Sequence, residues 1–292
     1  MELVCLHFIR KTLVNFLPTE VPKPDPCSCM KLSINQLKYF KSLHERKYRQ
    51  KYHKFIVEGV KLANEVLEAG SLHVETVVAV PDWLEKNQGL LGQVGNIVPV
   101  TEAELKKISL LNTPNQVYML VTQPDLVFDE GATIAAPILY LEEIRDPGNL
   151  GTILRIADWF GIPWVICSPG SVEAYSPKVV QASMGAFLRV KCVEMDFDAL
   201  CSRLPDLAVY GAVLEGVSML EIPLLSPAII AIGNESQGLS AAIQQKLTHR
   251  VAIPKGPGGG AESLNAAVAT GIIVSQFVLR KAQPDAPIQI LQ

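Results

Sequence analysis

Three short segments in the second half of the chain combine glycine, asparagine and proline with isolated charged residues. They are Asp146–Arg155, Ile232–Ser240 and Ile253–Ala269. Each follows a short apolar run and leads into a helix-like pattern, which is how an α/β protein builds a site from the loops at the ends of its strands. The sequence therefore predicts one composite pocket that contains an arginine, a glutamate and asparagines.

Arg155 is the isolated cation of the first segment. It lies about one and a half turns into the expected helix, at ~3.6 residues per turn, and its sequence neighbours are apolar. An arginine on a mostly buried helix requires a carboxylate partner or an anionic ligand. The structural alternative to a ligand is a salt bridge to Glu142, Glu143 or Asp158.

Three other polar residues of these segments have both a structural and a functional interpretation. Asn149 suits the left-handed geometry of a turn, and Glu235 is placed to cap the helix expected after the second segment. Asn265 can cap the final helix in the same way. The functional alternative is that these side chains bind a ligand or brace a neighbouring loop.

The third segment contains a glycine-rich run, Gly256–Gly260, that allows backbone to approach a ligand closely. Its spacing does not match the dinucleotide fingerprint, and no acidic residue ends a following strand. The chain also lacks the Gly-Lys-Ser/Thr of phosphate-loop NTPases and the Gly-x-Ser-x-Gly elbow of many hydrolases. These absences argue against a dinucleotide-dependent enzyme and against both of those classes.

A basic run with interleaved tyrosines lies between residues 38 and 54, although the whole chain has a net charge of −3. A solvated helix face is the usual explanation of such a run. The alternative is RNA binding, because phosphate contacts combined with aromatic stacking suit single-stranded or looped RNA. The predicted RNA-binding residues are Lys41, Arg46, Lys47, Arg49 and Lys51.

The periodicity divides the chain into four parts. Residues 1–30 are expected to be a disordered extension, 31–123 a small α/β domain, 124–136 a linker, and 137–285 a larger α/β domain. Apolar runs predict strands at 54–57, 74–80, 116–122, 137–142, 164–167, 208–214, 228–232 and 250–253. Helices are expected at 60–69, 152–160, 177–183, 241–247 and 263–281. Alternating strands and helices in the second domain indicate a parallel sheet covered on both faces.

The composition limits the cellular setting and the inorganic chemistry. The six cysteines are scattered, and no zinc-ligand spacing is completed, so we expect reduced thiols and no metal. The longest apolar stretch near the end, 266–279, is interrupted by polar residues and is too short to span a bilayer. A cytoplasmic protein without membrane contact is therefore expected.

The three segments resemble, in order, the three motifs of the SpoU/TrmH branch of the SPOUT RNA methyltransferases. The matching residues are Asp-Pro-x-Asn-x-Gly-x-Ile-x-Arg in 146–155, Gly-Asn-Glu-x-x-Gly-Leu-Ser in 233–240, and Ile253-Pro254 followed by Ser-Leu-Asn in 263–265. The resemblance implies a parallel α/β domain with a deep trefoil knot, S-adenosylmethionine as cofactor, and a homodimer. The implied reaction is methyl transfer to a ribose 2′-hydroxyl of RNA.

The resemblance also implies roles for individual residues. The cofactor-binding residues would be Leu214, Glu215, Gly216, Gly233, Asn234, Ile253 and Leu264. The catalytic residues would be Arg155, Asn149, Glu235, Ser263 and Asn265. We expect Arg155 to bind a phosphate and stabilise the developing alkoxide, because the pKa of a guanidinium, above ~12, makes it a poor base. The glycine-heavy insert departs from the family pattern.

Residues 31–122 resemble the small ribosomal-protein-like domain that often precedes this module. Lys47–Arg49 and Phe55–Gly59 carry the likeness. Members of the family with this extra domain tend to act on ribosomal RNA, which favours ribosomal RNA as the substrate. The alternatives are a transfer-RNA 2′-O-methyltransferase, a non-catalytic RNA-binding or ribosome-assembly protein, and a different enzyme on a dinucleotide-binding fold.

Overall fold

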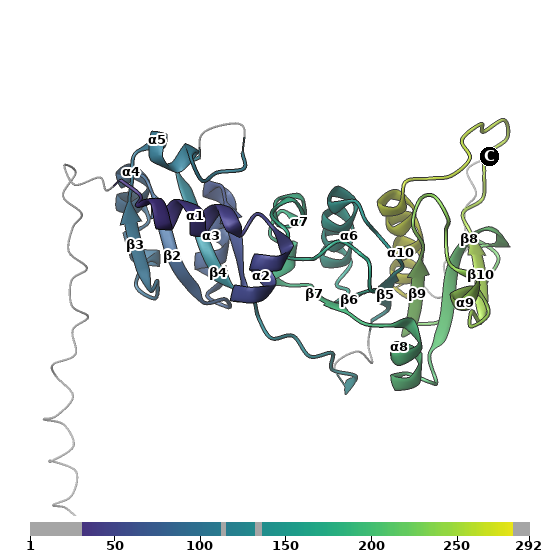
Figure 1. The fold of residues 1–292 in the computed structure, drawn as a ribbon. Coiled ribbons are helices and arrows are strands. Elements are labelled where there is room, and N and C mark those ends of the chain that lie inside the picture. The colour runs from purple at the N-terminus through teal and green to yellow at the C-terminus, as the bar shows by residue number, and fades with distance from the viewer. Residues whose placement is uncertain (1–30, 112–114, 132–135, 283–292) are drawn as a thin grey trace, which may run out of the picture.

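The computed structural model describes residues 31–111, 115–131 and 136–282. The extension predicted for residues 1–30 lies outside the described residues. Two separate β-sheets organise the described chain, one of four strands and one of six (Figure 1). No helix in these ranges is long and apolar enough to cross a membrane. The same ranges contain no group of three or more histidine, cysteine, aspartate or glutamate side chains arranged to hold a metal ion.

The four-stranded sheet has the order β1-β4-β2-β3. β4 runs antiparallel to β1 and β2, and β3 runs parallel to β2. Its strands are β1 (Lys54–Glu58), β2 (Val74–Ala79), β3 (Asn96–Pro99) and β4 (Val117–Thr122). The helices around it are α1 (Ile34–Ser42), α2 (Arg46–Tyr52), α3 (Val60–Ala69), α4 (Pro81–Lys86), the 3-10 helix η1 (Gln88–Leu90) and α5 (Glu102–Lys106). The helix predicted over residues 60–69 is confirmed.

The six-stranded sheet has the order β10-β8-β9-β5-β6-β7, and every pair in it is parallel. Its strands are β5 (Ile138–Leu141), β6 (Trp164–Cys167), β7 (Lys191–Glu194), β8 (Ala208–Ser218), β9 (Ala228–Ile232) and β10 (His249–Ala252). The helices are α6 (Pro147–Trp159), α7 (Pro177–Ser183), the 3-10 helix η3 (Ala186–Leu188), α8 (Phe197–Arg203), α9 (Ala241–Gln244) and α10 (Ala266–Ala282). The parallel α/β sheet predicted for this part is confirmed.

Helices cover both faces of the parallel sheet. Successive side chains of its strands are therefore buried alternately in two cores, one on each face. Leu139 and Leu141 of β5 face a core that α6, α7 and α10 complete, while Tyr140 faces a second core with Phe197 of α8 and Ile243 of α9. β7 and α8 were not predicted from the sequence. β7 lies at the edge of the sheet and its residues are at most half-buried, so it lacks the apolar run of a central strand.

The small domain packs directly on the parallel domain. Val180 of α7 and Phe187 of η3 are buried in the same apolar cluster as Phe55 of β1. Arg49 of α2 lies across the same junction, where its guanidinium donates to the carboxylate of Glu173, with an Nη2–Oε2 distance of 2.7 Å. The junction therefore joins an apolar contact to a buried ion pair, and α2 is held beside the parallel sheet (Figure 1).

Candidate active site at the carboxyl edge of the parallel sheet

The three motif loops leave the parallel sheet at the same edge. They follow β5, β9 and β10, and parallel strands have their carboxyl ends together, which is where open α/β sheets bind ligands. Asp146 begins α6 as its N-cap, and its Oδ1 accepts from the Asn149 amide at 2.8 Å, while Pro147 occupies the first helical turn. This capping geometry presents the Asn149 side chain at the start of α6.

A chain of side-chain hydrogen bonds joins the three loops. The Nδ2 of Asn149 donates to Oε1 of Glu235, and its Oδ1 accepts from Nδ2 of Asn265 at 2.9 Å. Oδ1 of Asn265 in turn accepts from the amides of Ala267 and Val268 at 3.0 and 3.3 Å, which caps the start of α10. Asn149 therefore braces both other loops, and the structural and functional interpretations of these residues are compatible.

The second loop is a tight turn that depends on glycine. A Cβ added to Gly233 would overlap the backbone of Gly238, so only glycine fits where these segments meet. Oδ1 of Asn234 accepts from the amides of Ser236 and Gln237 at 3.0 and 2.7 Å, which satisfies the turn internally. Asn234 thus holds the loop shape, and the turn leaves the neighbouring Glu235 exposed at the carboxyl edge.

Glu142 is a positioning residue whose sequence context predicts only a pairing with Arg155. It directly follows β5, and its Oε2 accepts from the amide of Ser240 at 2.7 Å, at the start of α9. Its backbone amide donates to the carbonyl of Ile232 at 2.8 Å. Glu142 therefore ties the first loop to both ends of the second loop. The sequence feature that could identify Glu142 as a site residue is its position immediately after a buried strand.

Arg155 lies on the exposed face of α6, and its guanidinium forms no ion pair within the described residues. The structural alternative for Arg155, a salt bridge to Glu142, Glu143 or Asp158, is therefore wrong. Asp158 pairs with Arg189 at 2.8 Å and Glu143 pairs with Arg145 at 2.7 Å, while Glu142 faces the second loop. The helix is buried only along the stripe that contains Leu150, Gly151, Ile153, Leu154 and Ala157. The exposed guanidinium is consequently free to bind an anion.

The residues predicted to bind the cofactor through β8 lie where that strand leaves its neighbour. The pairing of β8 with β10 passes from Gly211 opposite Arg250 to Val217 opposite Val251. The segment 212–216 therefore bulges out of the ladder. It carries the exposed Leu214, Glu215 and Gly216 next to β10, the strand that precedes the third loop. In that loop Ser263 and Leu264 are exposed, and Ile253 packs partly against the core.

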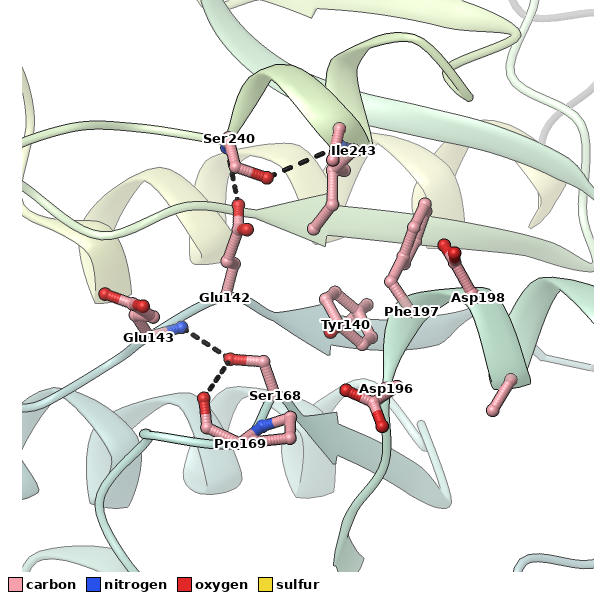
Figure 2. Close-up of a pocket in the computed structure, with 12 residues that line it drawn as sticks. Tyr140, Glu142, Glu143, Ser168, Pro169, Asp196, Phe197, Asp198, Ser240 and Ile243 are labelled. Atoms are coloured by element: carbon pink, nitrogen blue, oxygen red, sulfur yellow. Dashed lines mark hydrogen bonds between the residues drawn. The ribbon is translucent and has the colours of Figure 1, made fainter.

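A cavity at this edge of the sheet does not coincide with these residues. It has a volume of about 610 Å³ and lies over the carboxyl ends of β5 and β6, between α8 and α9 (Figure 2). Tyr140, Ser168 and Ile243 line it together with carboxylates. The acidic side chains are Glu142, Glu143, Asp196 and Asp198. Burial raises the pKa of Tyr140, aided by the charge of Glu142. These carboxylates repel the phosphates of RNA, so the cavity is unsuited to bind its backbone. Ser240 is the one motif residue among those that line this cavity.

Backbone strain marks the same edge. Glu143 adopts a left-handed conformation, with φ of 49°, which is unfavourable for a residue with a side chain. Its amide donates to Oγ of Ser168 at 2.9 Å, and this bond holds the turn that precedes the first motif loop. The chain continues from this turn into the Asp146 cap of α6.

The residues predicted to bind RNA separate into two groups. Lys41, Lys47 and Lys51 are exposed, and the ammonium groups of the latter two lie 4.8 and 5.4 Å from the ring centroids of Tyr48 and Tyr52. These two rings are stacked at an interplanar angle of 11°. The exposed group presents cations and aromatic faces together, as the prediction requires.

The prediction for Arg49 is corrected by its burial. Only 3% of the residue is exposed, because its guanidinium is enclosed at the domain junction by Glu173 and by the carbonyls of Leu43 and His44. Arg46 is exposed but pairs with Glu194 of β7 at 3.3 Å. A buried arginine and an exposed arginine cannot be told apart in a basic run of the sequence. Only the packing of α2 against the parallel domain shows that Arg49 is buried and Arg46 is exposed.

Comparison with known proteins agrees with this arrangement. Residues 136–275 match the family model described as the SpoU rRNA Methylase family, and residues 35–118 match one described as the MRM3-like substrate binding domain. The 23S rRNA (guanosine(2553)-2'-O)-methyltransferase RlmP of Bacillus subtilis is 30% identical over 247 residues, which cover 82% of this chain and 94% of that protein.

Two solved structures share the fold over most of this chain. One is a putative RNA methyltransferase of the TrmH family from Porphyromonas gingivalis, with 38% identity and a TM-score of 0.75, covering 86% of this chain and all of that one. The other is an AdoMet-bound rRNA methyltransferase from Sinorhizobium meliloti, with 26% identity and a TM-score of 0.75, covering 87% and 98%. With its three motif loops joined at one sheet edge and a relative matched over nearly its full length, the chain belongs to the SpoU rRNA methylase family.

Proposed function

We propose that the protein transfers a methyl group from S-adenosylmethionine to a ribose 2′-hydroxyl of ribosomal RNA. The observation that carries this proposal is the junction of Asn149, Glu235 and Asn265, which joins three loops at one edge of the sheet, at the start of the helix that carries the exposed Arg155. The Bacillus subtilis relative is named as a 23S rRNA 2′-O-methyltransferase, and the Sinorhizobium meliloti structure is described as AdoMet-bound.

The residues around the third loop fit the cofactor. An adenosine group has apolar ring faces and hydrogen-bonding edges, so it suits apolar side chains beside available backbone groups. Leu214 is 77% exposed and Leu264 is 44% exposed, which provides apolar surface on the β8 bulge and on the third loop. The bulge at 212–216 frees backbone groups from the ladder with β10, and the turn at Gly233 brings a third backbone segment to the same edge.

The chemistry divides between the cofactor and the chain. When bound, S-adenosylmethionine supplies an electrophilic methyl group on a sulfonium. Arg155 binds the phosphate next to the reacting ribose and stabilises the charge that develops on the 2′-oxygen, since its planar guanidinium contacts two oxygens at once. Glu235 or a phosphate oxygen accepts the hydroxyl proton. Asn149 holds Glu235 in place through its side-chain amide.

The small domain is proposed to bind ribosomal RNA and to have the ribosomal-protein-like fold that the resemblance implies. Its exposed cations Lys41, Lys47 and Lys51 lie on α1 and α2, beside the stacked Tyr48 and Tyr52. Cations provide contacts with any phosphate, while tyrosine faces stack on unpaired bases. The match to a substrate-binding domain favours this part of the chain as the reader of the substrate.

A homodimer and a trefoil knot complete the proposal. α10 packs on α6, where Gly271 lies against Ile156, and the outer surface of this helix pair carries the exposed apolar residues Trp159, Val268 and Leu279. Trp159 is 84% exposed. A second copy of the chain would cover these side chains and enclose Arg155, which shares the exposed face of α6 with Trp159.

The test is tritiated methyl transfer from S-adenosylmethionine to deproteinised total RNA, followed by size separation. Label in large ribosomal RNA, lost with Arg155→Ala, is the expected result. Label in transfer RNA would overturn the substrate while keeping the chemistry. Failure of calorimetry to detect S-adenosylmethionine binding by the folded protein would refute the methyltransferase proposal and favour an RNA-binding protein without catalytic activity.

A further inference from the structure

A cleft of about 240 Å³ lies at the junction of the two domains. α2 of the small domain forms one wall through Arg46 and Arg49. The opposite wall comes from the parallel domain, through Arg145 and the segment Gly170–Ser176. None of the predicted catalytic or cofactor-binding residues lines this cleft, and Arg145 was not among the predicted RNA-binding residues. The cleft is therefore a separate feature that the motif residues do not explain.

The cleft lies along the same edge of the parallel sheet as the motif loops. Arg46 contacts Glu194 at the carboxyl end of β7, and Arg49 contacts Glu173 in the segment after β6. Arg145 follows β5 and directly precedes the Asp146 cap of α6. In the sheet order β5-β6-β7, this series runs from α2 toward the first motif loop. The cleft thus extends from the basic helix α2 to Arg145, the residue that directly precedes the first motif loop.

One ion pair of the cleft is buried, while two other arginines that line it are accessible. The Arg49–Glu173 pair has side chains only 4% and 14% exposed, and two backbone carbonyls also hold the guanidinium. Arg46 and Arg145 have side chains 48% and 74% exposed, and their carboxylate partners Glu194 and Glu143 are also well exposed. Exposed ion pairs contribute little to stability, so both arginines can exchange a carboxylate for another anion.

We propose that this cleft binds a phosphodiester of the substrate RNA through Arg46 and Arg145, between the nucleotides that α2 contacts and the nucleotide that is methylated. The proposal rests on the proposed function, because it takes the motif loops as the place of methyl transfer. Guanidinium groups bind phosphate through two parallel hydrogen bonds, and hydroxyls such as that of Ser176 at the cleft wall can add a donor. Since the walls belong to two docked domains, the bound phosphate sets the spacing between recognition and reaction.

The experiment measures binding of the full chain to a fluorescein-labelled single-stranded RNA of mixed sequence by anisotropy, over a series of salt concentrations. Arg46→Ala and Arg145→Ala should each weaken binding severalfold and reduce the slope of log K against log salt by about one, the value for one lost phosphate contact. Glu194→Gln should tighten binding, because it frees Arg46 and removes a repelling carboxylate. Titration calorimetry with S-adenosylmethionine should be the same for all of these variants.

Matched controls come from the ion pairs around α8. Arg203 pairs with Glu130 at 3.3 Å with a side chain 42% exposed, close to the values for Arg46, and Asp198 pairs with Lys246. Arg203→Ala and Asp198→Asn should leave the affinity and the salt slope unchanged. Equal slopes for Arg145→Ala and Arg203→Ala would overturn the proposal. Weaker binding by Glu194→Gln would also overturn it, because that result would show the Arg46 pair to be structural.

A methyl-transfer assay on the unmodified chain distinguishes failure of the cleft proposal from failure of the proposed function. Transfer to ribosomal RNA with unchanged salt slopes in the arginine variants would refute the cleft and leave the proposed function intact. RNA binding with the expected slopes, but without any methyl transfer, would refute the proposed function and retain the cleft as an RNA-binding site.

Discussion

The side-chain amide of Asn265 donates a 2.9 Å hydrogen bond to Oδ1 of Asn149, which lies 116 positions earlier in the chain. Because Asn149 also donates to Glu235, one amide group connects the loops after β5, β9 and β10. A side-chain amide suits this place because it carries a donor and an acceptor at once. The three motifs therefore act as one unit, and the loss of the middle residue should affect the other two.

We predict that Asn149→Ala lowers kcat/KM for methyl transfer by roughly 10–100-fold, in line with the loss of residues that orient a site. Glu235 and Asn265 would each lose a partner, so their loops would sample more conformations. Asn149→Asp should be at least as harmful, because it places a second carboxylate against Glu235. The measurement is steady-state kinetics with ribosomal RNA, using Asn96→Ala, at an exposed position of the edge strand β3, as the control. Activity of Asn149→Ala equal to that control would contradict the bracing role.

Arg155→Ala is expected to reduce kcat by roughly 10²–10³-fold, the usual effect of removing a group that stabilises transition-state charge. Its free energy of unfolding should stay within about 0.5 kcal/mol of the parent, because the side chain is exposed and has no ion-pair partner in the described part of the chain. Arg155→Lys keeps the charge but loses the planar fork. Near-normal turnover by the lysine variant, in single-turnover assays, would show that the shape of the guanidinium is dispensable.

Arg49→Ala should destabilise the protein by roughly 3–5 kcal/mol, the range for removing one partner of a buried ion pair. Glu173 would remain at the junction without its cation, and the carbonyls of Leu43 and His44 would lose their donor. Urea unfolding followed by circular dichroism measures the change, and Arg46→Ala, in an exposed pair, should change stability by about 1 kcal/mol or less. Equal effects of the two substitutions would refute the structural role of Arg49.

Gly151→Ala should destabilise the protein by roughly 1–3 kcal/mol, the cost of overpacking. A Cβ at this position would overlap the Ala182 side chain and lie 2.9 Å from its carbonyl carbon, where α6 crosses α7. Gly271→Ala in α10 is the matched control, since its Cβ would lie at 3.4 Å from Cδ1 of Ile156 and alanine favours a helix by up to about 1 kcal/mol. Thermal unfolding should therefore show a lower stability for Gly151→Ala than for Gly271→Ala. A similar loss of stability in both variants would show that the close α6–α7 contact does not require glycine at position 151.

The stability should also depend on pH through Glu58. Burial raises the pKa of this carboxyl above its usual value of 4.5, although Ser109 and the Leu110 amide donate to it. Above pH 4.5 the unfolded chain loses this proton before the folded chain does, so the contribution of Glu58 to stability falls as pH rises toward the folded-state pKa. The unfolding free energy of the parent minus that of Glu58→Gln should therefore fall as the pH rises from 4.5 to the folded-state pKa of Glu58. Urea titrations at a series of pH values measure it, and a difference that grows with pH would reverse the assigned sign.

The sequence by itself determined the local elements and the order of the motifs. The helix over residues 60–69 agrees with the prediction, because its apolar residues recur with helical spacing on the face that is buried. The central strands of the parallel sheet were predictable for a related reason, since strands buried on both faces are continuous apolar runs. β7 was missed because an edge strand that is half-exposed carries no such run.

Only the tertiary structure decided which polar residues are free to act. Arg49 lies in a basic run of the sequence and Arg155 lies among apolar neighbours, yet Arg49 is the one enclosed, by Glu173 124 positions away, while Arg155 remains exposed. Local periodicity reports which face of an element is buried, but a charge is paired or free according to which distant element docks against it. The acidic cavity beside Tyr140 and the basic cleft beside Arg145 arise in the same way, from residues of several elements that meet only when the chain is folded.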